Sequence, residues 1–346
     1  MNKGEINVKE KGYLRRVLKN ASFDKMKQAI NTVHEKSGKN KLAIFLDMAM
    51  CTLRYGSGYY DYQIFGFYNL NAAQRKTYVT RFINKKLNLY LNDVDYCHYF
   101  DNKDEFYTMF GEYTGRDFLD LSKSSRDDVA AFVEGKDQIF CKLRDKTCGI
   151  GCERLNISDF ESVDALYDYL KEKQFYTIEG VLKNHPDVAR LYDNAVNSMR
   201  IITLMDDDKK VHCLYIVQKM GMNGGVVDNN SMFSPVDIET GRMKYPAHSG
   251  ETTLGNVYTE HPNSHITIQG YQLPYVKEAV QMVFEAAQKI PQVRFVGWDV
   301  AVTENGPVII EGNTYCAHDF WQLPPHTPDK IGMLPTITKL IPDFKY

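Results

Sequence analysis

The sequence contains no apolar run approaching the roughly 20 residues that a membrane-spanning helix needs. No secretory signal pattern follows Met1, and the seven cysteines are an odd number, as expected of free thiols in a reducing compartment. Cys148 and Cys152 are the closest pair, but no second pair of ligands lies nearby, which argues against a zinc site. These absences predict a cytoplasmic protein.

Three familiar catalytic signatures are also missing. There is no GxxxxGK[ST] phosphate-binding loop, no HExxH zinc motif and no GxSxG nucleophile elbow. The net charge of −2 argues against nucleic-acid binding through overall basicity. With 43% apolar and 25% charged residues, the composition is that of an ordinary globular protein with a sizeable core.

The charge that is present is unevenly distributed. Residues 1–41 carry eleven Lys and Arg against four Asp and Glu, a net +7, which leaves −9 for the rest of the chain. We expect solvated helices here that pack on the body by one face. The alternative is weak contact of the Lys and Arg face with an anionic membrane surface. The apolar residues that define two helical stripes are Leu14, Val17, Leu18, Met26, Ile30 and Val33.

Beyond about residue 101 the helix and strand patterns become regular. Strands in hairpins with interspersed helices indicate an α+β fold. We expect three regions: an N-terminal helical and aromatic-rich region (1–100), and two further domains of residues 101–174 and 175–346. The predicted helices are 104–112, 126–134 (capped by Ser125 and ended by Gly135), 160–172 and 274–290. The predicted strands are 138–143, 152–157, 175–182, 198–205 and 210–221.

The stretch VGWDVAVTENGPVIIEGN, residues 296–313, reads as a hairpin with an Asn-Gly turn. A two-residue Asn-Gly loop would place Asp299 opposite Gly312. A three-residue Glu-Asn-Gly loop would place Asp299 opposite Glu311 and bring Asn313 to the same face. We predict the three-residue loop, because only that register separates apolar from polar side chains. Its further pairs are Thr303–Pro307, Val302–Val308, Ala301–Ile309 and Val300–Ile310.

This register suggests a metal site. Two carboxylates opposed across strands repel each other unless a cation lies between them. The oxygen ligands of Asp299, Glu311 and Asn313 suit Mg²⁺ that is shared with substrate phosphates. The alternative is an ordinary surface hairpin with solvated acidic residues, and this segment alone favours neither interpretation.

A magnesium–phosphate site also needs cations that hold a nucleotide. Lys142 ends a predicted strand directly before a loop that contains Gly149 and Gly151, whose backbone amides can approach phosphate oxygens. Lys103 opens a predicted helix and would by itself be taken as a surface lysine. Most such Gly-x-Gly pairs are merely turns.

Three further residues are candidates for substrate or nucleotide contacts. Glu179 lies where a strand runs into a glycine, which can offer an edge to adenine, although an edge-strand glutamate is the simpler interpretation. Arg200 lies in an apolar strand and requires a partner, which could be a substrate carboxylate, a phosphate or a neighbouring Asp. His261 lies in the loop HPNSH, where substrate contact is possible but a surface loop is the more ordinary outcome.

Taken in order, these residues resemble the ATP-grasp superfamily, and most of all its sugar-transfer-associated branch. The resemblance covers about residues 42–322 and is most specific in GWDVAVTENGPVIIEGN, NSMRIITL, VVDNN and FDNKDEFYTMF. It implies an ATP-grasp fold with two α+β subdomains that clamp ATP. Residues 101–174 would be the small lid subdomain, and residues 175–346 the large subdomain with the Mg²⁺ and ATP site.

The resemblance also implies roles for individual residues. Arg200 would face the reacting carboxyl and the transferred phosphoryl group, and the DKTCGIG loop would be the lid. Asp299, Glu311 and Asn313 would ligate Mg²⁺, with Glu311 shared by two ions. The implied nucleotide contacts are Lys103 and Lys142 at the phosphates, and Glu179 and Val181 at the adenine. Asp228 and Asn229 would border the acceptor substrate.

The sequence departs from the pattern of this branch at two places. Leu143 follows Lys142 where proline is usual, and Cys148 occupies a loop that is usually richer in glycine. Lys219 stands where arginine is expected, which leaves the identity of the acidic substrate open.

The chemistry implied by the resemblance is ATP-dependent ligation of a carboxylate to an amine through an acyl phosphate, which needs no protein nucleophile. We expect ATP and two Mg²⁺ ions as cofactors, and small-molecule or glycan carboxylates and amines as substrates, in cell-surface polysaccharide or related metabolite synthesis. One alternative is a kinase on the same fold that phosphorylates a hydroxyl. Another is an inactive nucleotide-binding or scaffold protein, against which the intact metal-ligand set argues.

Overall fold

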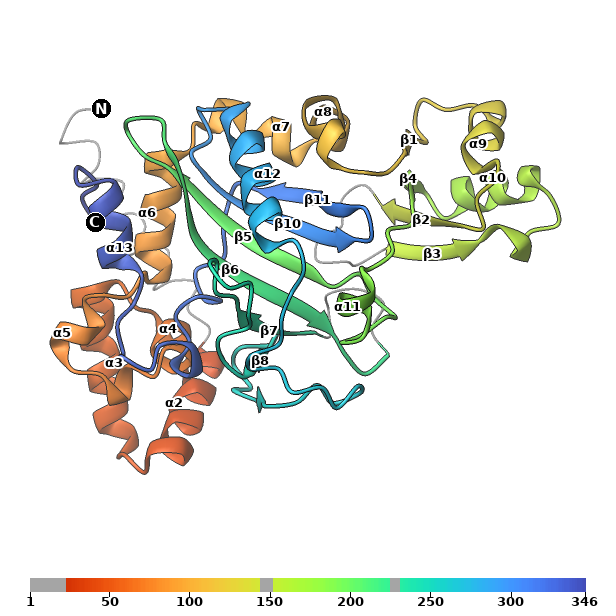
Figure 1. The fold of residues 1–346 in the computed structure, drawn as a ribbon. Coiled ribbons are helices and arrows are strands. Elements are labelled where there is room, and N and C mark those ends of the chain that lie inside the picture. Colours follow the sequence, from red (N-terminus) through yellow and green to blue (C-terminus); the bar gives the residue numbers. More distant parts are fainter. Residues whose placement is uncertain (1–22, 144–151, 225–230) are drawn as a thin grey trace.

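The computed structural model describes residues 23–143, 152–224 and 231–346. Its strands form two antiparallel sheets of unequal size (Figure 1). The small sheet has the order β1-β4-β2-β3, and the large sheet has the order β11-β10-β5-β6-β7-β8-β9. These sheets, together with the surrounding helices, confirm the predicted α+β class.

The elements have the following bounds. The strands of the small sheet are β1 (Phe118–Asp120), β2 (Gln138–Leu143), β3 (Cys152–Asn156) and β4 (Phe175–Gly180). Those of the large sheet are β5 (Ser198–Met205), β6 (Val211–Gly221), β7 (Ser231–Pro235), β8 (Ala247–Ser249), β9 (Val257–Tyr258), β10 (Phe295–Thr303) and β11 (Gly306–Asn313). The helices are α2 (Phe23–Ser37), α3 (Lys41–Tyr55), α4 (Tyr59–Ile64), α5 (Ala72–Arg75), α6 (Arg81–Leu91), α7 (His98–Asp101), α8 (Lys103–Phe110), α9 (Arg126–Val133), α10 (Val163–Glu172), α11 (Pro186–Ala189), α12 (Val276–Gln288) and α13 (Leu334–Leu340).

Most predicted elements lie where their local signals put them. The predicted strands 138–143 and 198–205 match β2 and β5 to the residue. Ser125 caps α9, because its side chain accepts a hydrogen bond from the Asp128 amide. Helix α10 starts three residues later than expected, because Ser162 caps its start by accepting a hydrogen bond from the Ala165 amide.

The small sheet is covered by α9 and α10. Its core is formed by buried apolar residues of these helices and of the strands, among them Val129, Leu166, Ile139 and Ile178. Strand β4 belongs to this sheet, although it begins at residue 175, immediately after the boundary expected between 174 and 175.

The large sheet is covered on both faces. Helix α12 packs its buried positions, such as Ala279 and Val283, against one face together with Trp298 and Val300. On the other face, Val217 and Phe233 join the core of the N-terminal helices α2–α4. Helices α6 and α13 pack around Leu204 on this second face. None of the described helices is long and apolar enough to cross a membrane.

In the β10–β11 hairpin, the predicted loop length is wrong, but the predicted pairing of Asp299 with Glu311 is confirmed. Thr303 pairs with Gly306, so the loop has two residues, Glu304 and Asn305, and the predicted three-residue loop is wrong. The register then shifts between Asp299 and Val300, and this bulge restores the predicted pairing of Asp299 with Glu311. The predicted pairs between the bulge and the turn are wrong by one residue: Val300 pairs with Ile309, Ala301 with Val308 and Val302 with Pro307.

Candidate nucleotide and metal site

Three charged residues lie side by side across neighbouring strands of the large sheet. Glu311 on β11 pairs with Asp299 on β10, and Asp299 pairs with Arg200 on β5. Directly paired residues point to the same face of a sheet, so their side chains form one row, which we call the charged row. Two acidic residues of the β10–β11 hairpin thus meet an arginine of β5, a strand far away in the sequence.

The centre of the charged row is an ion pair between buried Asp299 and partly buried Arg200. Arg200 donates hydrogen bonds to both carboxylate oxygens of Asp299, with 2.7 Å between Nη2 and Oδ2. Burial alone would raise the pKa of Asp299, but the charge of Arg200, assisted by Lys219, lowers this pKa to about 2. Of the partners considered for Arg200, a neighbouring Asp is therefore the one present. Asp299 is an anion at every physiological pH.

Glu311 has the opposite electrostatic environment. Its side chain is exposed, yet the surrounding chain removes part of its hydration, and this loss together with the Asp299 charge raises the pKa of its carboxyl. Asn313 lies beside it, and the Asn313 side-chain amide donates to Glu311 Oε1 at 3.2 Å and to the Gly297 carbonyl at 3.3 Å. A divalent cation would relieve the repulsion between two carboxylates on directly paired residues.

The side chains of Asp299, Glu311 and Asn313 fit Mg²⁺ by their chemistry, because all three supply hard oxygen atoms. Each carboxylate oxygen of Asp299 has a second lone pair beyond the one that Arg200 uses. Among the described residues there is no group of three His, Cys, Asp or Glu that would form a metal cage of its own. A magnesium ion at Asp299, Glu311 and Asn313 would therefore need further oxygens from a nucleotide or water.

A second cluster of charges lies in the small sheet. Glu179 is buried and forms ion pairs with Lys142, at 2.7 Å, and with Arg116, at 2.9 Å. Burial alone would raise the pKa of Glu179, but these two cations lower it to about 2. Lys103 lies beside the cluster, where its ammonium donates to the Leu143 carbonyl at 3.4 Å. We call Lys103, Lys142, Arg116 and Glu179 the cationic cluster.

The predicted adenine contact at Glu179 stays a prediction, and the structure shows what this residue already contacts. The Glu179 side chain is directed at the two cations of the cluster. Strand β4 has neighbours on both sides, with Phe118 and Phe140 opposite Glu179, so the backbone here belongs to the sheet. Val181 is the first residue beyond the strand.

Both predicted phosphate lysines belong to the cationic cluster. Burial lowers the pKa of Lys103, and the charge of Lys142 nearby lowers it further. Negatively charged phosphate oxygens would reduce the repulsion between these two neighbouring ammonium groups. The charge of Glu311 also acts on Lys103, so the cationic cluster and the charged row lie near each other.

Arg116 was not predicted from the sequence. Besides its bond to Glu179, its guanidinium donates to the carbonyls of Ile309 and Ile310 on β11, at 3.2 and 3.4 Å. It therefore ties the small sheet to the strand that carries Glu311. The segment TGRDF has no periodic pattern around the arginine, and the only local signal is Gly115, whose φ of +58° allows a tight turn.

The remaining predicted substrate residues are placed as follows. Lys219 is buried, and its charge helps to lower the pKa of Asp299, so it lies near the charged row. His261 is fully buried, with Nε2 bonded to the Gly221 carbonyl at 2.8 Å and Nδ1 accepting from the Asn263 amide. A substrate contact at His261 would have to break these bonds. Gly149, Gly151, Asp228 and Asn229 lie outside the described residues.

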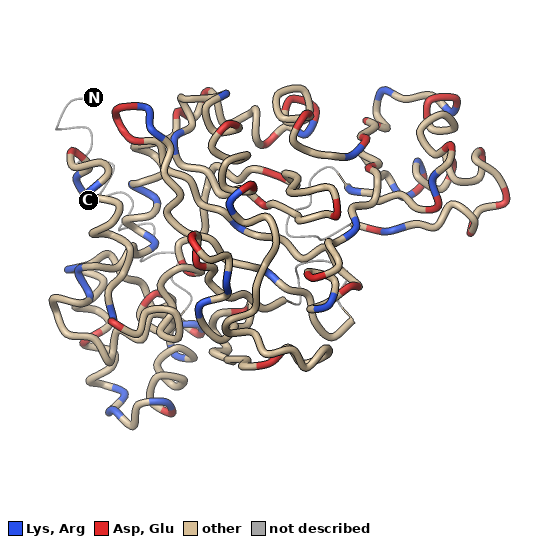
Figure 2. Tube along the Cα trace, in the orientation of Figure 1, with Lys and Arg blue, Asp and Glu red and all other residues tan. Residues whose placement is uncertain are grey.

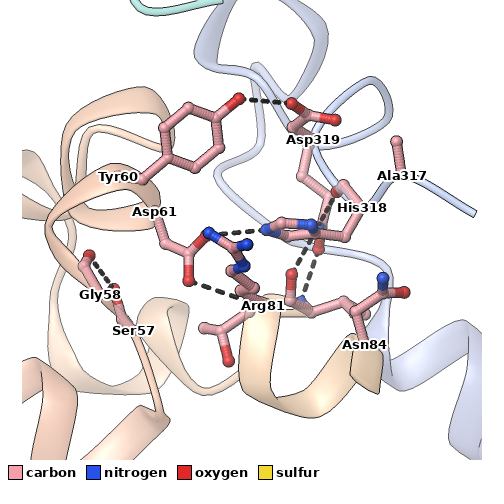
Figure 3. A network of polar contacts seen from close by, with 12 residues as sticks. Ser57, Gly58, Tyr60, Asp61, Arg81, Asn84, Ala317, His318 and Asp319 are labelled. Atoms are coloured by element: carbon pink, nitrogen blue, oxygen red, sulfur yellow. Dashed lines mark hydrogen bonds and ion pairs between the residues drawn. The ribbon is translucent and has the colours of Figure 1, made fainter. Parts of the chain in front are cut away.

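The chain beyond Asn313 is held by the N-terminal helices through a buried polar network (Figure 3). Nε2 of His318 lies 2.7 Å from a carboxylate oxygen of Asp61, which is 1% exposed. The Tyr60 hydroxyl donates to Asp319 at 2.6 Å. Burial alone would lower the pKa of His318, but Asp61 and Asp319 raise it.

Helix α6 completes this attachment. Asn84 donates to the Cys316 carbonyl at 2.8 Å, and Asn92 donates to the Thr314 carbonyl at 2.8 Å. These bonds hold the backbone directly after Asn313, the last residue of β11. The N-terminal helices thus support the end of the strand that carries two of the three predicted metal ligands.

One comparison with known protein families agrees with the resemblance seen in the sequence. A family model described as sugar-transfer associated ATP-grasp matches residues 127–327. Similar solved structures include D-alanyl-alanine synthetase A from Vibrio cholerae (15% identity, TM-score 0.38, covering 70% of this chain and 60% of that chain). Others are an L-amino acid ligase from Bacillus licheniformis (11%, TM-score 0.38, 65% and 43%) and a precursor-peptide-bound macrocyclase from Microcystis aeruginosa (11%, TM-score 0.40, 78% and 73%). The matched region spans less than two thirds of the first two structures. No curated protein matches the sequence.

Proposed function

The chain belongs to the sugar-transfer associated ATP-grasp family, and on that premise we propose that it is an ATP- and Mg²⁺-dependent carboxylate–amine ligase. Its substrates would be a small-molecule or glycan carboxylate and an amine, in cell-surface polysaccharide or related metabolite synthesis. The observation that carries the proposal is the charged row. A partly buried arginine there holds one carboxylate ionised beside a second carboxylate and an amide.

In the proposed reaction, an oxygen of the substrate carboxylate attacks the γ-phosphorus of ATP and ADP leaves. The amine then attacks the carbonyl carbon of the acyl phosphate, and the amide forms as phosphate and a proton are released. Magnesium held by Asp299, Glu311 and Asn313 would neutralise charge on the β- and γ-phosphate oxygens. Lys142 and Lys103 hold the phosphates, and Arg200 keeps Asp299 ionised and oriented.

Trapping the acyl phosphate tests this proposal. Purified protein is incubated with ATP, Mg²⁺ and a panel of uronic and amino acids, with hydroxylamine as the amine. We expect ADP, free phosphate and a hydroxamate with at least one acid. Glu311→Gln should abolish all three, whereas Glu304→Gln, an exposed acid in the turn of the same hairpin, should not.

Two other outcomes would replace the proposal. ADP without free phosphate, accompanied by a stable phosphorylated product, would indicate a kinase. ATP turnover by the wild type that equals that of Glu311→Gln across a broad panel of acids, amines and sugars would indicate a protein without catalysis at this site.

A further inference from the structure

Helix α3 has apolar side chains on two opposite faces. Asn40 caps its start and Gly56, with a φ of +62°, ends it. On the inner face, Ile44, Met48 and Cys51 are buried in the core that α2–α4 share. A surface helix of a globular protein normally has apolar residues only on such an inner face, and polar residues on the face that contacts water.

The outer face of α3 is also apolar. Its residues follow one another at positions i, i+3, i+4, i+8 and i+11, which all lie on one side of a helix. Their side chains are well exposed: Leu42 (65%), Phe45 (41%), Leu46 (58%), Met50 (43%) and Leu53 (79%). We call these five residues the α3 stripe. A continuous exposed apolar surface of this kind marks an interaction site.

Basic residues border the α3 stripe. Lys41 precedes Phe45 by one helical turn, and Arg54 follows Met50 by one turn, so both lie next to the stripe and both are exposed. Helices α2 and α3 and the turn between them carry six Lys and Arg against three Asp and Glu (Figure 2). One of these three acids, Asp47, is already paired with Arg75 at 2.7 Å. The surface around the stripe is therefore positively charged.

We propose that the α3 stripe docks on an anionic lipid membrane surface. An apolar helix face bordered by Lys and Arg is the combination that inserts at the boundary between headgroups and acyl chains of such a surface. The +7 charge of residues 1–41 adds electrostatic attraction to the same end of the chain. Association of two copies through the stripe is disfavoured, because it would bring two basic surfaces together.

Docking in this orientation is compatible with the rest of the molecule. Helices α2–α5 lie at one end of the molecule, and the small sheet with α9 and α10 lies at the other (Figure 1). A membrane bound at α3 would therefore leave the small sheet in water. The inference does not depend on the proposed reaction.

Vesicle co-sedimentation of the full-length protein tests the inference. The vesicles are phosphatidylcholine with about a third phosphatidylglycerol, and phosphatidylcholine alone serves as the neutral comparison. We expect binding to the anionic vesicles that weakens in high salt, and much weaker binding to the neutral ones. Leu53→Glu and Leu46→Glu should each reduce binding by at least roughly tenfold, because each removes a leucine from the lipid contact.

Leu89→Glu is the matched control, since Leu89 is a leucine of α6 that is 71% exposed. It should bind vesicles as the wild type does. Thermal unfolding of all three variants should be unchanged, because the substituted side chains are exposed in the folded protein.

Absence of wild-type binding would overturn the proposal, and so would binding that Leu53→Glu and Leu46→Glu leave intact. Light scattering distinguishes the other occupant of the stripe. A wild-type dimer that Leu53→Glu dissociates, without any vesicle binding, would show that the stripe joins two copies of the chain.

Discussion

The two sheets each carry a group of charged side chains, with an excess of cations in the small sheet and an excess of carboxylates in the large sheet. In the small sheet, Lys142 and Arg116 share one carboxylate, Glu179, and Lys103 adds a further cation. In the large sheet, two carboxylates, Asp299 and Glu311, share one cation, Arg200. A magnesium–nucleotide complex needs both kinds of partner, since phosphate oxygens bind ammonium groups and the metal binds carboxylates.

The two glutamates show how this division works. Glu179 is more deeply buried than Glu311, yet its pKa falls to about 2 because two cations contact it. The pKa of Glu311 rises, because loss of hydration and the Asp299 charge act in the same direction. The charge of Glu179 is thus neutralised by cations of the protein. Glu311 and Asp299 together carry an excess of negative charge that a divalent cation would neutralise.

The largest expected effect is that of Glu311→Gln. This change keeps the shape of the side chain but removes the excess negative charge, so ATP turnover should fall by at least roughly a hundredfold. Turnover of ATP measured by ADP release checks this expectation. Glu304→Gln should retain full turnover, and equal loss in both variants would point to a general defect of the hairpin.

Glu179→Met should reduce stability more than nucleotide affinity. The change leaves Arg116, which is 4% exposed at its side chain, without its carboxylate, and loss of one partner of a buried pair costs roughly 3 kcal/mol. Chemical denaturation measures this loss, with the exposed Glu134→Met as control. An unchanged unfolding free energy combined with a raised KM for ATP would instead give Glu179 a direct nucleotide contact.

Lys142→Met tests the other half of the comparison. Removal of one cation from the cationic cluster should weaken ATP binding roughly tenfold, because a charged contact to phosphate is lost. Titration calorimetry with ATP gives the affinity. Lys173→Met, a change at an exposed lysine of the same part of the chain, should bind ATP normally. Normal binding by Lys142→Met would remove this lysine from the proposed phosphate site.

The smallest effect concerns pH and the support behind β11. His318 has a raised pKa in the folded protein, against about 6.5 when unfolded, because Asp61 and Asp319 outweigh burial and the nearby Arg81. Its contribution to stability is therefore fully present below about pH 6.5 and is lost as pH rises through the folded pKa. Tm of the wild type should fall over this window relative to Tm of His318→Gln. Parallel pH profiles would contradict the assignment.

The sequence predicted most elements beyond residue 101 and the pairing of Asp299 with Glu311, because both follow local rules. Strand alternation and the separation of polar from apolar faces were enough to place Asp299 opposite Glu311. The predicted turn of this hairpin was wrong, however. The prediction used a three-residue loop, whereas the chain has a two-residue loop and a bulge before Glu311. The alternation of side chains does not reveal such a bulge.

The contacts of Glu179 and Arg116 could not be predicted in the same way. They depend on which strands become neighbours, and β4 lies between β1 and β2 although it comes last of the four in the chain. Arg116 lies two residues before β1 in a segment without periodicity, so no sequence pattern indicates that it reaches Ile309. The outer face of α3 was equally hidden, because its apolar spacing does not show which of two faces is buried.

The central claim is that Asp299 and Glu311 hold magnesium together with ATP. Titration calorimetry of ATP with and without Mg²⁺ tests it most directly, in the wild type, in Glu311→Gln and in Glu304→Gln. We predict that Mg²⁺ strengthens ATP binding by at least roughly tenfold in the wild type and in Glu304→Gln, and not in Glu311→Gln. The same Mg²⁺ dependence in all three proteins would contradict the claim.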